Sequence, residues 1–464
     1  MKEYQQTAME MMEFIEKSPT CFHAVANVKT KLAAAGFVEL KETEKWSISH
    51  GKGYYVTRND SSVIAFQMPE CVENQGKRHE SFTTVSENVV KGFHIVASHS
   101  DSPSFKLKES PEIQVEESYV KLNTEKYGGM ILSTWMDRAL SVAGRIVVKN
   151  QENQLVTKLV NIEKDLCVIP NLAIHMNRDM NKGVEYNPQV DMLPLMAGVM
   201  ECDDFSDDSS GSQQTAEEKN SAKNILAEMT AQCAGVNAEH IFGQDLFLYV
   251  REKGKLLGAN GEFVFSPRLD DLQCVYASLK AFTENISENY INVCAVFDNE
   301  EVGSGTRQGA DSTFLSDVLL RISEAMGQTA GEYRQMLAGS FLISADNAHA
   351  VHPNHPEKAD PTNRPYLNKG IVIKYHGSQK YTTDAATGAK IKQLCEKAGV
   401  PSQTYANRSD IVGGSTLGNI STAQVSVASA DIGFPQLAMH SAVETAGSRD
   451  TEYGIQMFKE FYRE

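Results

Sequence analysis

The sequence lacks any long hydrophobic run that could form a membrane-spanning helix. No stretch of the 464 residues approaches the roughly 18 consecutive apolar residues that a membrane-spanning helix needs. Residues 1–17 carry no apolar run of signal-peptide type, and Ala8, Met11, Met12 and Ile15 recur there at helical spacing. We therefore expect an amphipathic surface helix, no membrane partner and a cytoplasmic location.

Positive charge is also in short supply. The sequence has 44 Lys and Arg residues against 60 Asp and Glu residues, which gives a formal net charge of −16. A surface of this sign repels phosphate backbones and anionic lipids, so we expect no nucleic-acid partner. A local basic pocket for an anionic substrate remains compatible with this balance.

The eight cysteines lack the spacing of a disulfide framework or a structural zinc site. None forms a C-x-x-C pair, and Cys274 and Cys294 lie in apolar runs. This usage is typical of buried thiols in a reducing compartment. A cysteine nucleophile would need polar, activating neighbours, which the sequence does not place around any of the eight.

Length and periodicity together predict two domains and an α/β core. At 464 residues the chain exceeds one ordinary domain. Strands alternate with helices at both ends, which predicts an α/β fold with a central, mostly parallel sheet flanked by helices. The expected strands are 93–98, 246–250, 291–297, 341–345, 370–375 and 424–430, and the expected helices are 270–284, 311–326, 385–398 and 441–463.

The middle of the chain has a different pattern. Short alternating runs such as 112–120 and 155–160 are divided there by turn residues, which is typical of β-strands. We therefore predict that residues 101–244 form a β-rich insertion within a discontinuous α/β domain made of residues 1–100 and 245–464.

One segment interrupts the globular composition. Residues 201–223 are rich in Ser and Asp and nearly devoid of large apolar residues, which is typical of a mobile surface loop. The aspartates between positions 203 and 208 lack the spacing of a calcium-binding loop. We expect a solvated acidic insertion here.

The most informative stretch is 291–304, where an apolar strand runs into a group of carboxylates and stops at a glycine. Asp298, Glu300 and Glu301 would repel one another in a low-dielectric cleft. A divalent metal would remove that penalty and give the two glutamates separate roles, one as a ligand and one as a base. The alternative is a solvated acidic turn after a buried strand.

Further residues of metal-ligand type fall at the same sheet edge. His99 and Asp346 directly follow predicted strands, while Asp270 and His440 lie in adjoining connections. Because ligands bind beyond the carboxyl ends of strands in open α/β sheets, we expect these side chains to meet. Two histidines and three carboxylates, one of them shared, are the ligand set expected of a two-metal hydrolytic site.

Each of these residues also has a purely structural interpretation. His99 and His440 could be satisfied core histidines. Asp270 could be a helix cap, and Asp346 an Asx turn. Asp101 could be a turn residue, or a carboxylate that holds the imidazole of His99 by a hydrogen bond. All of these structural interpretations would have to be true at the same time, at strand ends that already carry the pair Glu300 and Glu301. We therefore favour a metal site.

Two loops complete the expected site. Residues 346–356 contain three histidines, which could bind metal by themselves, but two prolines impose an extended loop. We expect His349 and His352 to be polar wall residues that contact substrate. Residues 408–419 form a Gly-rich turn without either phosphate-loop pattern, so we expect the backbone at Gly414 to let a substrate approach closely.

With these residues placed, the chain resembles the M18 family of metallo-aminopeptidases, of the aspartyl aminopeptidase type. The similarity spans nearly the whole chain in order. The matching stretches are SPTCFH at 18–23, SHSDSP at 98–103, YGG at 127–129, WMDR at 135–138, IPNLAIH at 169–175, RLDDL at 268–272, DNEEVGS at 298–304, SADNAHAVHP at 344–353 and MHSAVET at 439–445.

The resemblance implies a role for each site residue. The implied metal ligands are His99 and Asp346 at one ion, Glu301 and His440 at the other, and Asp270 as the bridge between them. Glu300 would be the general base that takes a proton from the attacking water. The implied cofactors are two divalent ions, zinc in the first place, with manganese or cobalt as substitutes. The implied fold is of the zinc-peptidase type.

The resemblance also implies a substrate and an assembly. Lys374 aligns with the family lysine that meets an acidic substrate side chain, although it could be an ordinary exposed lysine. The β-rich insertion would be a dimerisation domain within a tetrahedral dodecamer, in which His175 reaches a neighbouring subunit's active site. Asp271 departs from the family pattern, where asparagine is common, and adds negative charge beside Asp270.

We therefore predict a dinuclear metal-dependent aminopeptidase that removes N-terminal residues, acidic ones in the first place and neutral ones as the alternative, from peptide substrates. A same-fold amidohydrolase acting on non-peptide amides is a second hypothesis. A self-assembling scaffold with an idle site is a third, and the complete set of ligands together with Glu300 argues against it.

Overall fold

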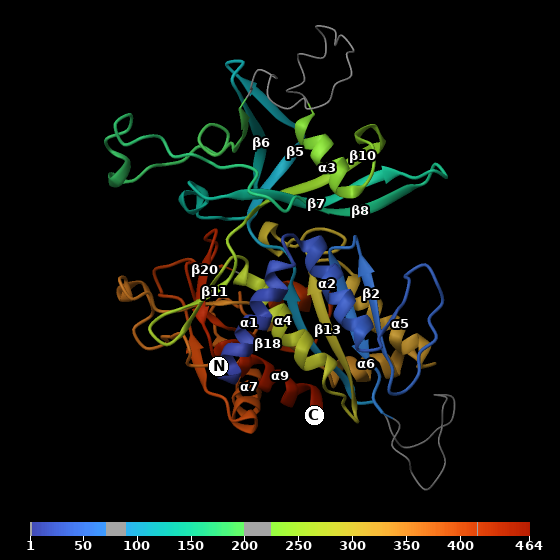
Figure 1. Ribbon diagram of the computed structural model, residues 1–464. Coiled ribbons are helices and arrows are strands. Elements are labelled where there is room, and N and C mark those ends of the chain that lie inside the picture. Colours follow the sequence, from blue (N-terminus) through green and yellow to red (C-terminus); the bar gives the residue numbers. More distant parts are fainter. Residues whose placement is uncertain (1, 71–89, 199–223, 415) are drawn as a thin grey trace. The chain divides into compact units, whose positions relative to one another are not determined.

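The computed structural model describes residues 2–70, 90–198, 224–414 and 416–464 (Figure 1). The acidic segment 201–223 lies outside the described residues. The chain divides into two compact units. Unit 1 consists of Met1–Ser102 and Lys253–Glu464, and unit 2 of Pro103–Glu252. Among the described residues, the helices are too short or too polar to cross a bilayer.

Unit 1 is built on a nine-stranded sheet with the order β1-β2-β3-β13-β4-β14-β18-β16-β17. The central strands β13, β4, β14 and β18 are parallel to one another, while β3 and β16 join this group as antiparallel neighbours. The strands are β1 (Val38–Glu39), β2 (Gly53–Arg58), β3 (Ser62–Gln67), β4 (Gly92–His99), β13 (Tyr290–Phe297), β14 (Phe341–Ala345), β16 (Ile371–Lys374), β17 (Ser402–Tyr405) and β18 (Ala428–Gly433). The prediction of a central, mostly parallel sheet is confirmed.

Helices cover both faces of this sheet, because the central strands are apolar on both sides. In β4, Val96 packs into one core cluster with residues of α1, α2, α4, α7 and α9, while Ile95 and Ala97 pack into another with residues of α5, α6 and α8 (Figure 1). This alternation follows from the two-residue period of a strand. The helices are α1 (Glu3–Glu16), α2 (Cys21–Ala34), α4 (Leu269–Thr283), α5 (Phe314–Ala325), α6 (Ala330–Ala338), α7 (Ala385–Ala398), α8 (Leu417–Gln424) and α9 (Asp450–Arg463).

A second, five-stranded sheet in unit 1 has the order β11-β12-β20-β19-β15. Its strands are β11 (Lys255–Leu257), β12 (Phe263–Ser266), β15 (Ala348–His349), β19 (Pro435–Leu437) and β20 (Glu444–Gly447). The turn between β19 and β20 carries His440, so this small sheet positions one of the expected metal ligands.

Unit 2 is a six-stranded antiparallel sheet with the order β8-β7-β10-β5-β6-β9. One helix, α3, packs on it at β8 (Figure 1). Its elements are β5 (Ser104–Val115), β6 (Tyr119–Tyr127), β7 (Leu140–Lys149), β8 (Leu155–Asn161), β9 (Leu195–Gly198), α3 (Ile225–Ala234) and β10 (Ile241–Val250).

The predicted strand 246–250 belongs to unit 2, which corrects its assignment to the α/β domain. It is the second half of β10, which pairs with β7 along its whole length and also touches β5. The boundaries therefore lie at 102/103 and 252/253, instead of the expected 100/101 and 244/245. The domain to which a strand belongs depends on the strands with which it pairs. A five-residue apolar run in the sequence does not indicate which strands these will be.

Two other predicted elements are shifted. The expected strand 424–430 is β18 at Ala428–Gly433, because residues Leu417–Gln424 form α8. The expected helix 441–463 begins only at Asp450 as α9, since residues before it pair as β20 with β12 and β19. Apolar residues at helical spacing also fit a short paired strand, which explains the second error.

Candidate metal centre

Three parallel strands end at one sheet edge and deliver the first site residues there. β4 lies between β13 and β14 and ends at His99, which is 1% exposed. β13 is followed by a short 3-10 helix at Glu300–Val302, and β14 by Asp346. The carboxyl ends of parallel neighbours meet at the same edge, so the sequence prediction that these residues converge holds in the structure.

Asp270 lies at the centre of this group. Its Oδ1 is 3.4 Å from the Nε2 of His99, and its Oδ2 is 3.5 Å from the Nε2 of His440. The same Nε2 of His440 is 3.3 Å from the Oε2 of Glu301, while the Nε2 of His99 is 3.9 Å from the Oδ1 of Asp346. Each oxygen of Asp270 thus faces one histidine.

The donor set fits divalent cations. Ligand atoms lie within 4.8 Å of one another in two groups that share Asp270, namely His99, Asp270, Asp271 and Asp346, and Asp270, Glu301 and His440. Glu301 is buried at its side chain, 3% exposed, and its Oε1 has no hydrogen-bond partner among the described residues. A buried carboxylate oxygen without a donor is costly unless a cation balances it, and imidazole with carboxylate is a usual ligand set for zinc.

Asp101 organises both sides of the site. Its backbone carbonyl lies 3.0 Å from the Nδ1 of His99, which leaves Nε2 to face Asp270. Its carboxylate accepts the backbone N–H groups of Glu300 and Glu301, both at 3.1 Å. The Oδ1 of Asp101 also lies 3.4 Å from the Nδ1 of His99, as expected from the sequence prediction that this carboxylate holds the imidazole, and the same carboxylate fixes the turn that carries the two glutamates.

Asp346 is held by two neighbours on its outer oxygen. Thr416 donates its hydroxyl proton to the Oδ2 of Asp346, and the Nζ of Lys374 lies 3.7 Å from the same atom. Burial disfavours the ammonium, but the nearby carboxylates, Asp346 first, raise the pKa of Lys374 above its usual value. Lys374 is thus a buried cation beside a metal-ligand residue and is not the ordinary exposed lysine of the alternative interpretation.

The sequence reasoning missed Glu444 and Thr416 as residues that support the site, and it noted Asp271 only for the negative charge that it adds beside Asp270. Glu444 accepts the backbone N–H groups of Asp270 and His440, and Asp271 accepts that of His99 at 3.1 Å. Thr416 binds Asp346. Side chains that bind distant backbone groups show no characteristic spacing in the sequence. The closeness of Glu444 to His440 along the sequence is the only signal that could have drawn attention to Glu444.

A pocket of about 310 Å³ opens onto these residues. Besides four residues of the charged centre, its wall includes His349, Gly414, Lys374 and the rings of two tyrosines, Tyr381 and Tyr405. Within the described parts of the chain, His352 is not part of this wall; its ring lies 5.4 Å from that of His355. His175 lies in an exposed turn of unit 2.

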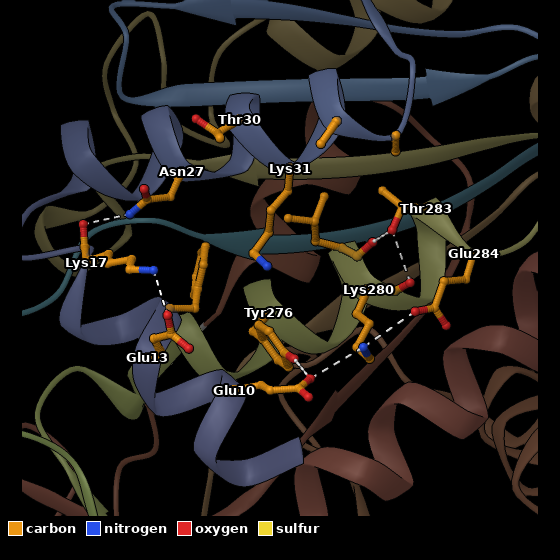
Figure 2. A pocket seen from close by; sticks show the side chains of 14 residues that line it. Glu10, Glu13, Lys17, Asn27, Thr30, Lys31, Tyr276, Lys280, Thr283 and Glu284 are labelled. Carbon is orange, nitrogen blue, oxygen red and sulfur yellow. Dashed lines mark hydrogen bonds and ion pairs between the residues drawn. The ribbon is translucent and has the colours of Figure 1, made fainter. Parts of the chain in front are cut away.

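A second pocket of unit 1, of about 630 Å³, lies between α1, α2 and α4 (Figure 2). Figure 2 shows that most of its charged side chains pair among themselves, while the Nζ of Lys31 lies 5.7 Å from the centre of the Tyr276 ring. Tyr276 donates to Glu10 at 3.0 Å, and the Nζ of Lys280 lies 3.6 Å from the same carboxylate. Lys17 pairs with Glu13 at 2.6 Å. These charges are already compensated, so the carboxylate and histidine cluster is the stronger candidate for chemistry.

Burial and mutual repulsion change the acidity of the site carboxylates. Burial, opposed by His99 and reinforced by Asp346, raises the pKa of Glu300 to about 8. Burial and then the charge of Asp270 raise the pKa of Glu444 to about 8. Without bound cations, both side chains therefore keep a proton in the folded protein at pH values where the unfolded chain has lost it.

This difference predicts how stability depends on pH when metal is removed with EDTA. The folded protein holds more protons than the unfolded chain up to about pH 8, so the free energy of unfolding should fall as pH rises from 7 to 9. The slope near pH 7 should reach about 1 kcal/mol per pH unit for each group. Urea unfolding at pH 7, 8 and 9 measures it.

The control for this experiment is Glu300→Gln, which removes one titrating group and should flatten the slope. Added zinc should raise stability most at the highest pH, since cations bind the deprotonated carboxylates. Stability that rises with pH across this window in EDTA would contradict the assignment.

Comparisons with known proteins show the family of the chain. Residues 14–462 match the family model described as "Aminopeptidase I zinc metalloprotease (M18)". The "Probable M18 family aminopeptidase 2" of Clostridium novyi (strain NT) is 49% identical over 457 residues, with 98% of each chain covered. Its counterpart in Clostridium acetobutylicum is 45% identical over 465 residues, with 100% of each chain covered.

Solved structures extend this similarity to the fold. A chain of the cryo-EM structure of the Ape4 and Nbr1 complex matches with a TM-score of 0.89 and 34% identity, covering 99% of this chain and 86% of that one. The S. cerevisiae mApe1 dodecamer matches with a TM-score of 0.80 and 27% identity, covering 99% and 97%. The chain therefore belongs to the M18 family of zinc metallo-aminopeptidases.

Proposed function

We propose that this aminopeptidase uses two divalent cations that share Asp270, with zinc as the resident metal. The observation that carries the proposal is the pair of donor groups around this residue. His99 and Asp346 lie on one side of it, and Glu301 and His440 on the other. When bound, the cations would supply Lewis-acid chemistry, lowering the pKa of a water and polarising the scissile carbonyl.

Glu300 would move the proton in this reaction. It lines the pocket, and the Asp101 carboxylate fixes its backbone N–H at 3.1 Å. The Oε2 of its neighbour Glu301 lies 3.3 Å from the Nε2 of His440, and Glu301 is not among the residues that line the pocket. Glu300 would accept the proton of the attacking water and return it to the departing amine, since one carboxylate can serve as base and then as acid.

We also propose that the substrate's first residue is preferably Asp or Glu, with neutral residues as the alternative. Lys374 is buried, lines the pocket and carries a positive charge. Its Nζ lies 5.5 Å from the centre of the Tyr381 ring, and His349 and Tyr405 form the adjoining wall. A buried cation at the pocket wall favours a substrate carboxylate, because the low dielectric strengthens their attraction.

Replacing Lys374 tests this preference. Lys374→Met should lower kcat/KM for aspartyl and glutamyl arylamides by roughly 10- to 10²-fold, which corresponds to a charged hydrogen bond. The value for leucyl arylamide should change little. Initial rates across this panel with zinc, manganese or cobalt measure the effect, and metal content is checked because Lys374 lies beside Asp346.

Lys380→Met is the matched control, since the Nζ of Lys380 donates to the carbonyl of Gly413 on the loop beside the pocket. It should leave the ratio of acidic to neutral rates unchanged. A wild-type enzyme that prefers leucyl arylamide, or an unchanged ratio in Lys374→Met, would contradict the acidic preference and leave the aminopeptidase activity itself intact.

We propose further that unit 2 mediates assembly into a homo-oligomer, as a tetrahedral dodecamer in which His175 reaches a neighbouring active site. Large apolar side chains support this. Met176 is 76% exposed beside His175, and Leu155 and Phe242 are 65% and 61% exposed on β8 and β10. Exposed apolar side chains of this size are typical of protein interfaces. The yeast relative's dodecamer points the same way.

A cytoplasmic location also stays a proposal. Within the described part of the chain, six cysteines form no disulfide, and five of them are buried. Free buried thiols are typical of a reducing compartment.

A further inference from the structure

Glu444 is a buried carboxylate, 2% exposed, at the start of β20. Its Oε2 accepts the backbone N–H of Asp270 at 3.0 Å, and its Oε1 accepts that of His440 at 2.8 Å. The two residues belong to different elements, the start of α4 and the turn between β19 and β20. One side chain therefore ties together the backbones that carry the central carboxylate and one histidine of the site.

The bond to His440 holds an unfavourable backbone conformation. His440 has φ of +66° and Ala438 has φ of +56°, so the turn contains two left-handed residues that are not glycine. This region is disfavoured for residues with a Cβ. Without an acceptor for its N–H, the turn would relax toward ordinary angles, and the imidazole would move away from Asp270 and Glu301.

The backbone of Asp270 is held on both of its peptide groups. Ser102 donates its hydroxyl proton to the Asp270 carbonyl at 2.7 Å, and Glu444 takes the N–H. The residue has non-helical angles, φ −78° and ψ 108°, within the first turn of α4. Helical hydrogen bonds therefore do not fix it, and these two side chains do.

Glu444 also connects to the third ligand segment. Gln436 donates to the Oε1 of Glu444 at 3.4 Å and accepts from Asn347 at 2.6 Å. Asn347 follows Asp346 directly. The buried chain of hydrogen bonds thus joins the segments of Asp346, Asp270 and His440.

We propose that Glu444 is a positioning residue, which fixes Asp270 and His440 at the separation that two cations require. This inference rests on the proposed two-metal function. The carboxyl group of Glu444 offers an oxygen to each of the two N–H groups, whereas the amide of a glutamine offers only one. In Glu444→Gln, one N–H would face the amide NH₂, and the geometry of one ligand would be lost.

Asp450 provides a matched control. It is also a fully buried carboxylate that accepts two backbone N–H groups, those of Asn368 at 2.7 Å and Gly370 at 3.0 Å. These partners are not metal-ligand residues. Glu444→Gln and Asp450→Asn thus remove the same kind of interaction. The first removes it at the candidate metal centre, and the second at the start of α9, between residues that are not metal ligands.

The experiment counts zinc bound to the full-length variants by equilibrium dialysis across free zinc concentrations, together with kcat, KM and the thermal midpoint in EDTA. We expect both variants to lose thermal stability. Glu444→Gln should bind one of two zinc ions about 10- to 100-fold more weakly, with kcat reduced to match and partly restored by excess zinc. Asp450→Asn should bind two zinc ions with wild-type affinity.

Equal zinc affinity in Glu444→Gln and wild type, at whatever midpoint, would overturn the inference. If Glu444→Gln does not fold, Glu444→Asp replaces it, since it keeps the charge but is too short to reach both N–H groups, and the same expectation holds. Binding of a single zinc ion by the wild type would overturn the two-metal proposal itself, so the two failures are distinguishable.

Discussion

Glu300→Gln should lower kcat for an aminoacyl arylamide by roughly 10²- to 10⁴-fold while zinc content stays at the wild-type value. The amide is nearly isosteric with the carboxylate but cannot accept a proton. Glu300 lines the pocket, and its turn is held by the Asp101 carboxylate, so the substitution should disturb neither the fold nor the cations. Steady-state kinetics and metal analysis on the same preparation measure both quantities.

The neighbouring residue supplies the matched control, because Glu301→Gln makes the same chemical change one position later. The Oε2 of Glu301 lies 3.3 Å from the Nε2 of His440. This variant should lose zinc as well as activity. If Glu300→Gln keeps its turnover, or if it loses zinc as Glu301→Gln does, the separation of the pair into base and ligand is wrong.

Asp270→Asn should weaken the binding of both zinc ions and abolish turnover within the range of a standard assay. Asp270 faces His99 through one oxygen and His440 through the other, so its loss affects both donor groups at once. An asparagine offers one neutral oxygen, and because the loss of a group that only orients a ligand typically costs about 10- to 100-fold in metal affinity, the loss of this carboxylate should cost more. Zinc titration followed by chelator competition measures the two constants.

Asp271→Asn is the control that removes a buried carboxylate at the neighbouring position. It tests whether the effect of Asp270→Asn depends on the position of Asp270 or only on the loss of a negative charge. Asp271 is also fully buried, and its Oδ2 accepts the backbone N–H of His99, a bond that an asparagine oxygen can keep. Burial, and to a smaller extent the charges of Asp346 and Asp270, raise the pKa of Asp271 well above its usual value. The neutral amide should therefore be tolerated. A loss of zinc equal to that of Asp270→Asn would contradict the central role of Asp270.

The site could be predicted from sequence because its residues follow strands. Each of His99, Glu300 and Asp346 comes just after an apolar run, and parallel strands collect such residues at one edge. Lys374 does not follow this rule, because β16, which it ends, runs antiparallel to β18. What placed His99, Glu300 and Asp346 was the periodicity of the strands, which the sequence displays directly.

The residues that hold this edge together could not be predicted in the same way. Glu444 and Thr416 act through hydrogen bonds to groups far away in sequence, and any polar residue in a loop could do so. The assignment of residues 246–250 failed for a related reason, since their partners lie in β7 about a hundred residues earlier. Long-range pairing leaves no local pattern, so it appears only in the structure.

The position of unit 2 within the chain has a consequence for folding. β4 and β13 are hydrogen-bonded neighbours, yet Pro103–Glu252 is synthesised between them. During translation both edges of β4 stay unpaired until β13 emerges, because its two neighbours in the sheet, β13 and β14, both follow unit 2 in the chain. Such non-local parallel pairing is slow and exposes strand edges to aggregation. His99 and Glu301 come together only when β4 has paired with β13. Zinc binding during folding can therefore be used to detect this late step in the assembly of the sheet of unit 1.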